Sequence, residues 1–137
     1  MKIETGTIRQ RVVINASPDE VYEAMVDAEI HSEFTGAKAT CVPKVGGKIS
    51  AWDGYIKGKN LKLSRGKRIV QEWKTTEWPR GYPPSVLDIS LKENGQKTTL
   101  TMIHSNVPKE QMSDYDDGWK IHYWKRMNEY FKKAKKR

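Results

Sequence analysis

The pattern of hydrophobic and polar positions divides the chain into a strand, two short helices, a run of strands and a long C-terminal helix. Residues 7–14 mix charged with β-branched side chains, which is typical of a strand. The motif Ser17-Pro18-Asp19-Glu20 begins a helix, because its serine can cap a backbone N–H, its proline suits the first helical position and its glutamate completes a capping box. A second short helix is predicted over residues 29–34, ending at Gly36.

Between residues 37 and 105 the pattern changes to short apolar runs separated by turn residues, which is typical of an antiparallel sheet. Asp53-Gly54 and Asn94-Gly95 indicate two-residue hairpin turns, because both residues tolerate a positive φ. Gly46-Gly47 and Arg65-Gly66 are expected to turn the chain in a similar way. The predicted strands are Ala39–Val42, Lys48–Trp52, Tyr55–Leu63, Arg68–Thr76, Ser85–Glu93 and Lys97–Ser105.

The last part of the chain carries one apolar helical face. From Gly118 onwards, aromatic residues and Met127 recur at helical spacing, and the acidic residues before the helix and the lysines at its end match the helix dipole. A straight helix lying on a curved sheet leaves space beneath it. We therefore predict an α+β fold with a cavity between the helix and the sheet.

Length and composition narrow the class of protein. The chain has 137 residues, so we expect one domain over residues 1–137, with a basic tail at 132–137. The single cysteine, Cys41, has no partner for a disulfide, and neither a signal peptide nor a membrane-spanning run of about 18 apolar residues is found in the sequence. These features predict a cytoplasmic protein without a membrane span.

The net charge of +8 is concentrated in two clusters. The basic tail is expected at a helix end, where nucleic-acid contacts would lack base readout, so no specific nucleic acid is predicted as a partner. The second cluster contains Lys57, Lys59 and Lys62. These lysines can protect sheet edges from aggregation, or they can contact an acidic partner protein. In the second interpretation, the partner surface also includes Trp78, Arg80 and Tyr82 on a predicted exposed hairpin.

Motifs for hydrolysis, phosphate binding, dinucleotide binding and zinc proteolysis are absent from the sequence. The three histidines fall on different predicted elements, so we expect neither a metal site nor a cofactor. The aromatic and methionine residues fit either a filled core or the walls of a pocket for an apolar or amphipathic ligand. The predicted pocket residues are Met25, Trp52, Trp73, Met102, Trp119, Tyr123 and Met127.

Several short motifs, taken in order, resemble the C-terminal domain of the activator of the heat-shock protein 90 ATPase. They are Phe34-Thr35-Gly36-Ala37, Val45-Gly46-Gly47-Lys48-Ile49, Asp53-Gly54-Tyr55-Ile56-Lys57-Gly58, Ile69-Val70-Gln71-Glu72-Trp73, Glu77-Trp78-Pro79-Arg80-Gly81 and the helix from Gly118 to Phe131. That family belongs to the START-like, or SRPBCC, helix-grip superfamily. The resemblance implies a curved antiparallel sheet around a long C-terminal helix, with two short helices after the first strand.

Three hypotheses about function follow. The first is a non-enzymatic domain that holds a small hydrophobic or amphipathic molecule in the cavity, as relatives in the superfamily do. The second is a protein-interaction module of the co-chaperone type, acting in the stress response on a chaperone or another acidic protein. The eukaryotic co-chaperone has an additional N-terminal domain that stimulates the ATPase, and 137 residues are expected to leave no room for it. The third is an enzyme that uses Glu72 as a base in the cavity.

Overall fold

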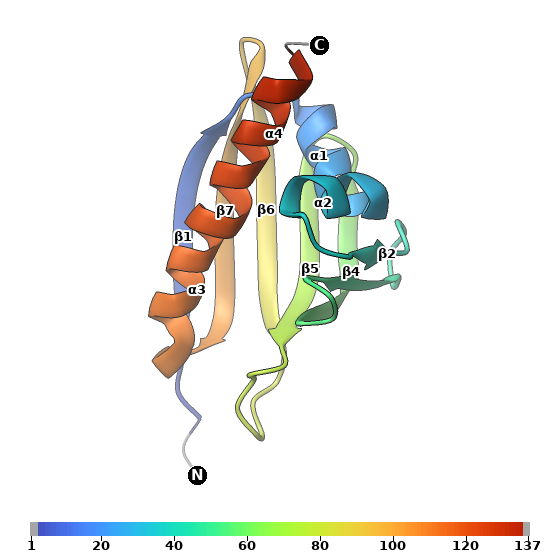
Figure 1. The fold of residues 1–137 in the computed structure, drawn as a ribbon. Coiled ribbons are helices and arrows are strands. Elements are labelled where there is room, and N and C mark those ends of the chain that lie inside the picture. Colours follow the sequence, from blue (N-terminus) through green and yellow to red (C-terminus); the bar gives the residue numbers. More distant parts are fainter. Residues whose placement is uncertain (1–2, 136–137) are drawn as a thin grey trace.

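The computed structural model describes residues 3–135, and their strands form one antiparallel sheet in the order β1-β7-β6-β5-β4-β3-β2 (Figure 1). The strands are β1 (Thr5–Ile14), β2 (Thr40–Cys41), β3 (Lys48–Ala51), β4 (Ile56–Ser64), β5 (Arg68–Thr75), β6 (Ser85–Asn94) and β7 (Lys97–Pro108). Strands that follow each other along the chain from β2 to β7 are neighbours, and β1 closes the order by pairing with β7. The predicted antiparallel sheet is confirmed.

Two short helices and one long helix pack beside this sheet. The short helices are α1 (Pro18–Val26) and α2 (Ala28–Thr35). A 3₁₀ turn, η1 (Lys109–Gln111), leads into α3 (Met112–Gly118), a π-helical segment η2 (Trp119–Trp124) and α4 (Lys125–Lys135). Residues 112–135 are called the long helix below. Figure 1 shows the long helix crossing one face of the sheet, with α1 and α2 beside it.

The first helix begins as its sequence predicts. The Ser17 side chain accepts a hydrogen bond from the Glu20 backbone N–H at 3.3 Å, and the Glu20 carboxylate accepts one from the Ser17 N–H at 3.0 Å. Pro18 occupies the first turn. The following helix ends at Gly36, whose φ of 78° is left-handed. Local sequence therefore determines both boundaries of this helical pair.

Two predicted turns differ from the structure. The β3–β4 connection has four residues, and Trp52, which was expected in the strand, has a left-handed φ of 53°. Asp53 causes the difference, because its N–H donates to the Lys38 carbonyl at 3.0 Å and its carboxylate accepts from the Lys38 N–H at 3.1 Å. In the β6–β7 hairpin, Asn94 pairs with Lys97, so the turn lies one residue later than predicted.

The long helix begins earlier than predicted. The polar stretch before Gly118 is helical from Met112 onwards, and Asp114 lies in the first turn. The backbone carbonyl and the carboxylate of Asp116 both accept hydrogen bonds from the Gln10 side-chain amide of β1, at 2.8 and 2.9 Å. These contacts attach the polar first turns of the helix to the sheet. The predicted basic tail begins in α4, where Lys132 and Lys133 are exposed, and residues 136–137 lie outside the described residues.

The core lies between the long helix and the face of the sheet that it covers. Alternate residues of the strands point into it, as period-two alternation requires. Its fully buried members include Ile14, Ile69, Leu87, Ile89, Leu100, Met102 and Met127. The opposite face of the sheet, called the outer face below, carries Lys57, Lys59 and Lys62. Lys57 and Lys59 lie on the part of β4 that pairs with both β3 and β5, so the interpretation as protection of a sheet edge is wrong for these two lysines. Lys62 follows the part of β4 that pairs with β3, and for this lysine the interpretation stays a prediction.

Candidate functional site

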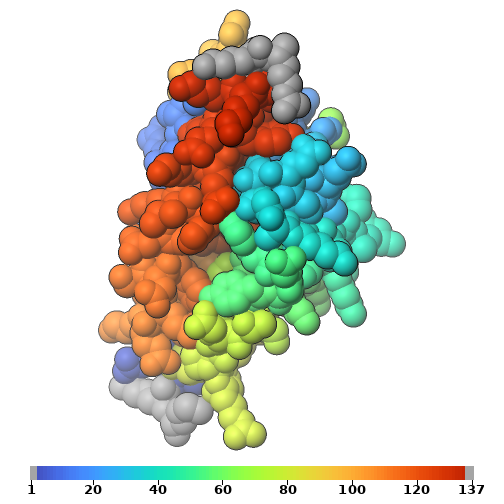
Figure 2. Space-filling view, in the orientation of Figure 1, coloured from blue at the N-terminus to red at the C-terminus, as the bar shows by residue number. Residues whose placement is uncertain are grey.

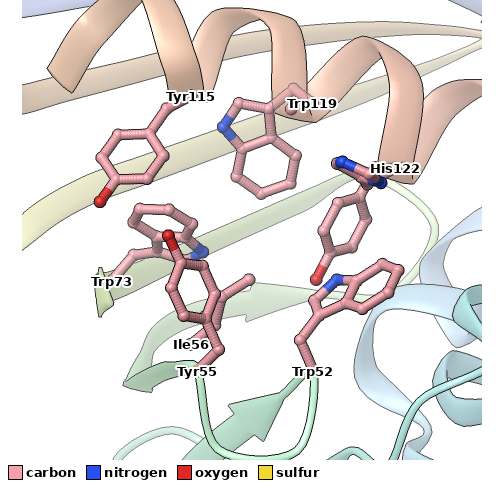
Figure 3. A pocket seen from close by; sticks show the side chains of 9 residues that line it. Trp52, Tyr55, Ile56, Trp73, Tyr115, Trp119 and His122 are labelled. Carbon is pink, nitrogen blue, oxygen red and sulfur yellow. The ribbon is translucent and has the colours of Figure 1, made fainter. Parts of the chain in front are cut away.

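A cavity of about 280 Å³ opens between the long helix and the β3–β4 loop. Figure 2 shows the molecular surface hollowed between the orange-red helix and the green loop segment, and Figure 3 shows the side chains around the space. The residues that line it are Trp52, Tyr55, Ile56, Trp73, Tyr115, Gly118, Trp119, His122 and Tyr123. The walls are therefore almost entirely aromatic, and none of these nine residues carries a carboxylate.

The seven predicted pocket residues separate into three groups. The three tryptophans and Tyr123 line the cavity, as the prediction placed them. Met25 lines a second space of only about 20 Å³, which shares Trp73 and Trp119 with the main cavity. Met102 and Met127 line neither space, because both are fully buried in the core. For these last two methionines, the alternative interpretation as filled core is the one that the structure supports.

Five lining residues were outside the predicted set. Tyr115 lies in the stretch that was expected to be non-helical, so its inward orientation carried no periodic signal. His122 is exposed at the mouth, and its ring meets that of Trp52 at 5.6 Å. The others are Tyr55, Ile56 and Gly118. Gly118 was the sequence signal from which the site could have been predicted, because a glycine is unusual inside a helix.

Trp52 forms one wall of the cavity from a strained backbone position. A left-handed φ is uncommon for a bulky residue and is maintained here by the Asp53–Lys38 hydrogen bonds. The indole ring stands edge-on to the ring of Tyr123, with 6.4 Å between centroids. The guanidinium of Arg126 lies 5.3 Å from the Trp52 ring, at a distance suited to a cation–π contact. These contacts fix the wall in place.

Gly118 leaves room beneath the long helix. Its φ of −59° and ψ of −42° are ordinary helical values that any residue can adopt, and a Cβ atom built on it would meet nothing within 4 Å. The π-helical segment follows directly. It places Trp119 and Trp124, five residues apart, in a stacked pair with centroids 5.4 Å apart. Such π-helical turns occur frequently at functional sites.

His104 connects the helix to the sheet below the cavity. The Trp119 indole N–H donates to Nδ1 of His104 at 3.1 Å, so the imidazole hydrogen must lie on Nε2. Nε2 then donates to the Ser85 hydroxyl at 2.8 Å, and that hydroxyl donates to the Trp73 carbonyl at 2.6 Å. Burial lowers the pKa of His104 to about 3. The histidine is therefore neutral, with both ring nitrogens used.

A second buried histidine supports the other side of the cavity. Nε2 of His31, in α2, shares a hydrogen bond of 2.9 Å with the Tyr123 hydroxyl. Burial lowers the pKa of His31 to about 4, although hydrogen bonds to the backbone of Met25 and Ala24 partly oppose the shift. Burial also raises the pKa of the Tyr123 hydroxyl, while a hydrogen bond from Trp52 opposes that change. Both groups are thus uncharged at neutral pH.

The β5–β6 loop contacts the cavity wall through Trp78, although none of its residues lines the cavity. The Trp78 ring packs against Trp73 with centroids 6.0 Å apart, and its N–H donates to the Pro83 carbonyl at 2.9 Å. Tyr82 is half-buried, and its hydroxyl accepts from the Glu4 N–H at 3.2 Å. Arg80 is exposed. The expected exposed hairpin is therefore only partly exposed, and its role in partner binding stays a prediction.

The Tyr55 and Tyr115 hydroxyls at the rim are already hydrogen-bonded. Tyr55 donates to the Glu77 carboxylate at 2.5 Å, and burial together with this hydrogen bond raises the pKa of the tyrosine. The hydroxyl of Tyr115 pairs with the Thr75 hydroxyl at 2.6 Å and with the Gln111 side chain at 3.0 Å. The hydroxyl hydrogens of both rim tyrosines are therefore used within the protein.

The outer face of the sheet carries the lysine cluster and Glu72. Glu72 alternates with the cavity residue Trp73 along β5, lies 4.0 Å from the Lys59 ammonium group, and does not line the cavity. The hypothesis of a Glu72 base acting on a ligand in the cavity is therefore wrong. Lys62 shares this face with Lys57 and Lys59 because a β-bulge follows Asn60 and shifts the register.

Within residues 3–135, no group of three or more His, Cys, Asp or Glu side chains is arranged to hold a metal ion. The helices of this same part of the chain are too short or too polar to cross a membrane.

The family of the chain follows from its sequence match. The family described as "Activator of Hsp90 ATPase homolog 1-like protein" matches residues 15–132. The chain belongs to this family. An HSP90 activator from Plasmodium falciparum has the same fold, with a TM-score of 0.77 at 23% identity over 85% of this chain and 89% of that chain. The predicted helix-grip fold of the activator family is thereby confirmed.

Curated members of the activator family are longer than this chain. The chain is 27% identical over 135 residues to an activator of 90 kDa heat shock protein ATPase homolog from Dictyostelium discoideum, and 29% identical over 131 residues to activator homolog 1 from Homo sapiens. The alignments cover 98% and 96% of this chain but 35% and 38% of those proteins. This chain thus spans little more than a third of the curated relatives that it matches.

Proposed function

We propose that this activator-family domain is a non-enzymatic, cytoplasmic binding domain that holds a small hydrophobic or amphipathic molecule in the aromatic cavity. The observation that carries the proposal is the open cavity of about 280 Å³ at the place where the long helix contains Gly118. Its volume is close to the lower end of the range for ligand sites, and its apolar walls with few polar groups match their usual lining.

The helix itself supports this assignment. A glycine inside a helix costs about 0.5–1 kcal/mol relative to alanine. At Gly118 the backbone does not require glycine, because its dihedral angles are ordinary helical values. Space beneath the helix is what a side chain at this position would remove. Gly118 therefore lowers the stability of the long helix but leaves the cavity beneath it open.

The proposed ligand site is tested by a substitution on the long helix that fills the cavity. Gly118→Phe places an aromatic ring in the space, because a Cβ at this position points into open volume rather than into packed atoms. Tryptophan fluorescence titrations with a panel of fatty acids, sterols and small aromatic molecules are expected to show binding to the unmodified chain. The Phe variant is expected to lose that binding while keeping the same circular dichroism spectrum.

Gly118→Ala is the matched control. It adds one methyl group, leaves most of the cavity open, and is expected to stabilise the fold by about 0.5–1 kcal/mol while binding is retained. If the unmodified chain binds no member of the panel, or if Gly118→Phe binds as well as Gly118→Ala, the cavity is not a ligand site and the proposal is wrong.

A second candidate function is supported by the outer face of the sheet. Lys48 lies directly opposite Lys59, and Lys57 lies directly opposite Lys74. Like charges in such cross-strand pairs are destabilising. Among the described residues, the ion pair that offsets this cluster is the 4.0 Å contact between Lys59 and Glu72. An acidic protein surface bound to this face would offset the repulsion between the paired lysines. We therefore propose binding to a chaperone as the alternative function.

This candidate is tested by charge reversal. The variant Lys57→Glu/Lys59→Glu is expected to weaken binding to a purified 90 kDa heat-shock protein about tenfold or more, and to reduce the salt dependence of that binding. The control is Lys132→Glu/Lys133→Glu, which changes the same charge on exposed residues of α4. Equal affinities for the unmodified chain and the β4 variant, measured by isothermal titration calorimetry at low ionic strength, would contradict the role of this surface.

A further inference from the structure

The indole N–H of Trp73 differs from those of the other tryptophans. Trp78, Trp119 and Trp124 donate to a carbonyl or side-chain acceptor at 2.9, 3.1 and 2.7 Å, and Trp52 donates to Tyr123. For Trp73, whose side chain is only 4% exposed, no acceptor is found among residues 3–135. A donor in so buried a side chain is normally hydrogen-bonded.

This N–H faces the cavity. Every side-chain nitrogen or oxygen that is fully shielded from solvent in the described chain has a hydrogen-bond partner, so the partnerless Nε1 of Trp73 must lie at an accessible surface. Trp73 lines the cavity, and Figure 3 shows its ring nitrogen on the side directed into the space between the labelled side chains. The floor of the cavity therefore presents one unused hydrogen-bond donor.

Neighbouring rings prevent the Trp73 side chain from rotating its indole N–H away from the cavity. Its centroid lies 4.7 Å from that of His104 and 5.2 Å from that of Tyr115, and both rings meet it nearly at right angles. Trp119 covers it at 5.6 Å. Rings packed on several sides hold the indole in one orientation. The donor is thus pre-positioned, which lowers the entropy lost when a ligand acceptor binds it.

The remaining walls restrict the shape of a ligand. Tyr55, Tyr115 and Tyr123 have their hydroxyls engaged with protein groups, so they offer a ligand their ring surfaces rather than further hydrogen-bond donors. Aromatic surfaces that enclose a narrow space favour flat aromatic molecules, which stack or meet them edge-on. A volume of about 280 Å³ fits a molecule of two or three rings better than a sterol or a long acyl chain.

We propose that the cavity takes a small planar aromatic molecule that carries a carbonyl or similar acceptor, and that the Trp73 N–H donates a hydrogen bond to this acceptor. The inference rests on the proposed ligand-binding function and specifies the chemical class of the ligand. Trp73 would be the residue that selects for the acceptor, while the surrounding rings select for flatness.

Two probes of nearly the same shape test the inference. In 2-acetylnaphthalene a carbonyl replaces the methylene of 2-ethylnaphthalene, so the pair differs mainly in the acceptor. The unmodified chain is expected to bind the acetyl probe about three- to tenfold more tightly, which is the net effect of one buried hydrogen bond. Trp73→Phe keeps a ring but removes the donor, and is expected to bring the ratio of affinities to about one.

The matched control is Trp124→Phe, which removes the N–H of an equally buried tryptophan outside the cavity lining and is expected to keep the preference. A second measurement needs no variant. In ¹H–¹⁵N spectra of the unmodified chain, the acetyl probe is expected to move the Trp73 indole signal downfield, whereas the ethyl probe is not. This readout remains informative even if Trp73→Phe does not fold.

The outcomes separate the two proposals. Equal affinity for both probes, or an acetyl preference that survives in Trp73→Phe, overturns the role of Trp73 and leaves the cavity as a ligand site. If a fatty acid or sterol binds in a manner abolished by Gly118→Phe while neither naphthalene binds, the ligand class is wrong and the proposed function stands. If no molecule binds, the proposed function itself is wrong.

Discussion

Replacing Trp119 with alanine is expected to cost about 4 kcal/mol or more of unfolding free energy. Trp119 is 3% exposed and packs against Trp73 and Tyr123, so its removal leaves a large void in the contact between helix and sheet. Large-to-small changes of this kind cost about 3–5 kcal/mol. The variant also leaves Nδ1 of His104 buried without a donor, which costs about 1–3 kcal/mol more.

Urea denaturation of the ligand-free chain measures this loss. Trp119→Phe is the control, because it retains most of the ring volume and removes the N–H. It is expected to cost about 1–3 kcal/mol, mainly from the unpaired His104 acceptor. A loss below about 1 kcal/mol in Trp119→Ala would mean that this tryptophan does not hold the long helix on the sheet.

Stability is expected to fall by about 4 kcal/mol between pH 7 and pH 5 through two buried histidines. Their folded-state pKa values of about 3 for His104 and about 4 for His31 lie below the unfolded value of about 6.5. Between pH 7 and pH 5 these histidines therefore become protonated in the unfolded chain, while they remain neutral in the folded chain. Stability is complete above about pH 7 and declines as the pH falls through 6.5 towards the folded values, by about 2 kcal/mol for each histidine by pH 5.

The slope, rather than the absolute stability, identifies these groups. His104→Gln and His31→Gln are each expected to reduce the difference in unfolding free energy between pH 7 and pH 5 by about 2 kcal/mol, even if both variants are less stable at every pH. Carboxylates contribute equally to the parent and to the variants, so they cancel in the comparison. An unchanged difference in both variants would show that the histidines are not buried in their neutral form.

Local sequence was sufficient for the parts of the fold that local chemistry controls. The capping box at Ser17 and the helix end at Gly36 depend on residues within one turn of each other, and both formed as expected. The β3–β4 loop shows the limit. Its Asp-Gly sequence indicates a two-residue turn, yet the hydrogen bonds from Asp53 to Lys38 extend the turn to Trp52. A contact between separate segments decided the conformation there.

The cavity was harder to predict than the fold. A methionine on the inner face of a helix has the same periodicity whether it fills the core, as Met127 does, or borders a space, as was expected. The difference depends on the local distance between helix and sheet, which no short-range pattern contains. Tyr115 was missed for a related reason. Its helix is polar, and the hydrogen bonds that hold it come from Gln10 at the other end of the chain.

The position of β1 in the sheet has a consequence for the order of folding. Residues 5–14 are made early, but they pair with residues 98–108 of β7. Pairings between segments this far apart in sequence form slowly, because the intervening chain must first be brought together. During synthesis, β1 therefore remains without its sheet partner until most of the domain has left the ribosome, and a chaperone that shields this strand is expected to raise the yield of folded protein.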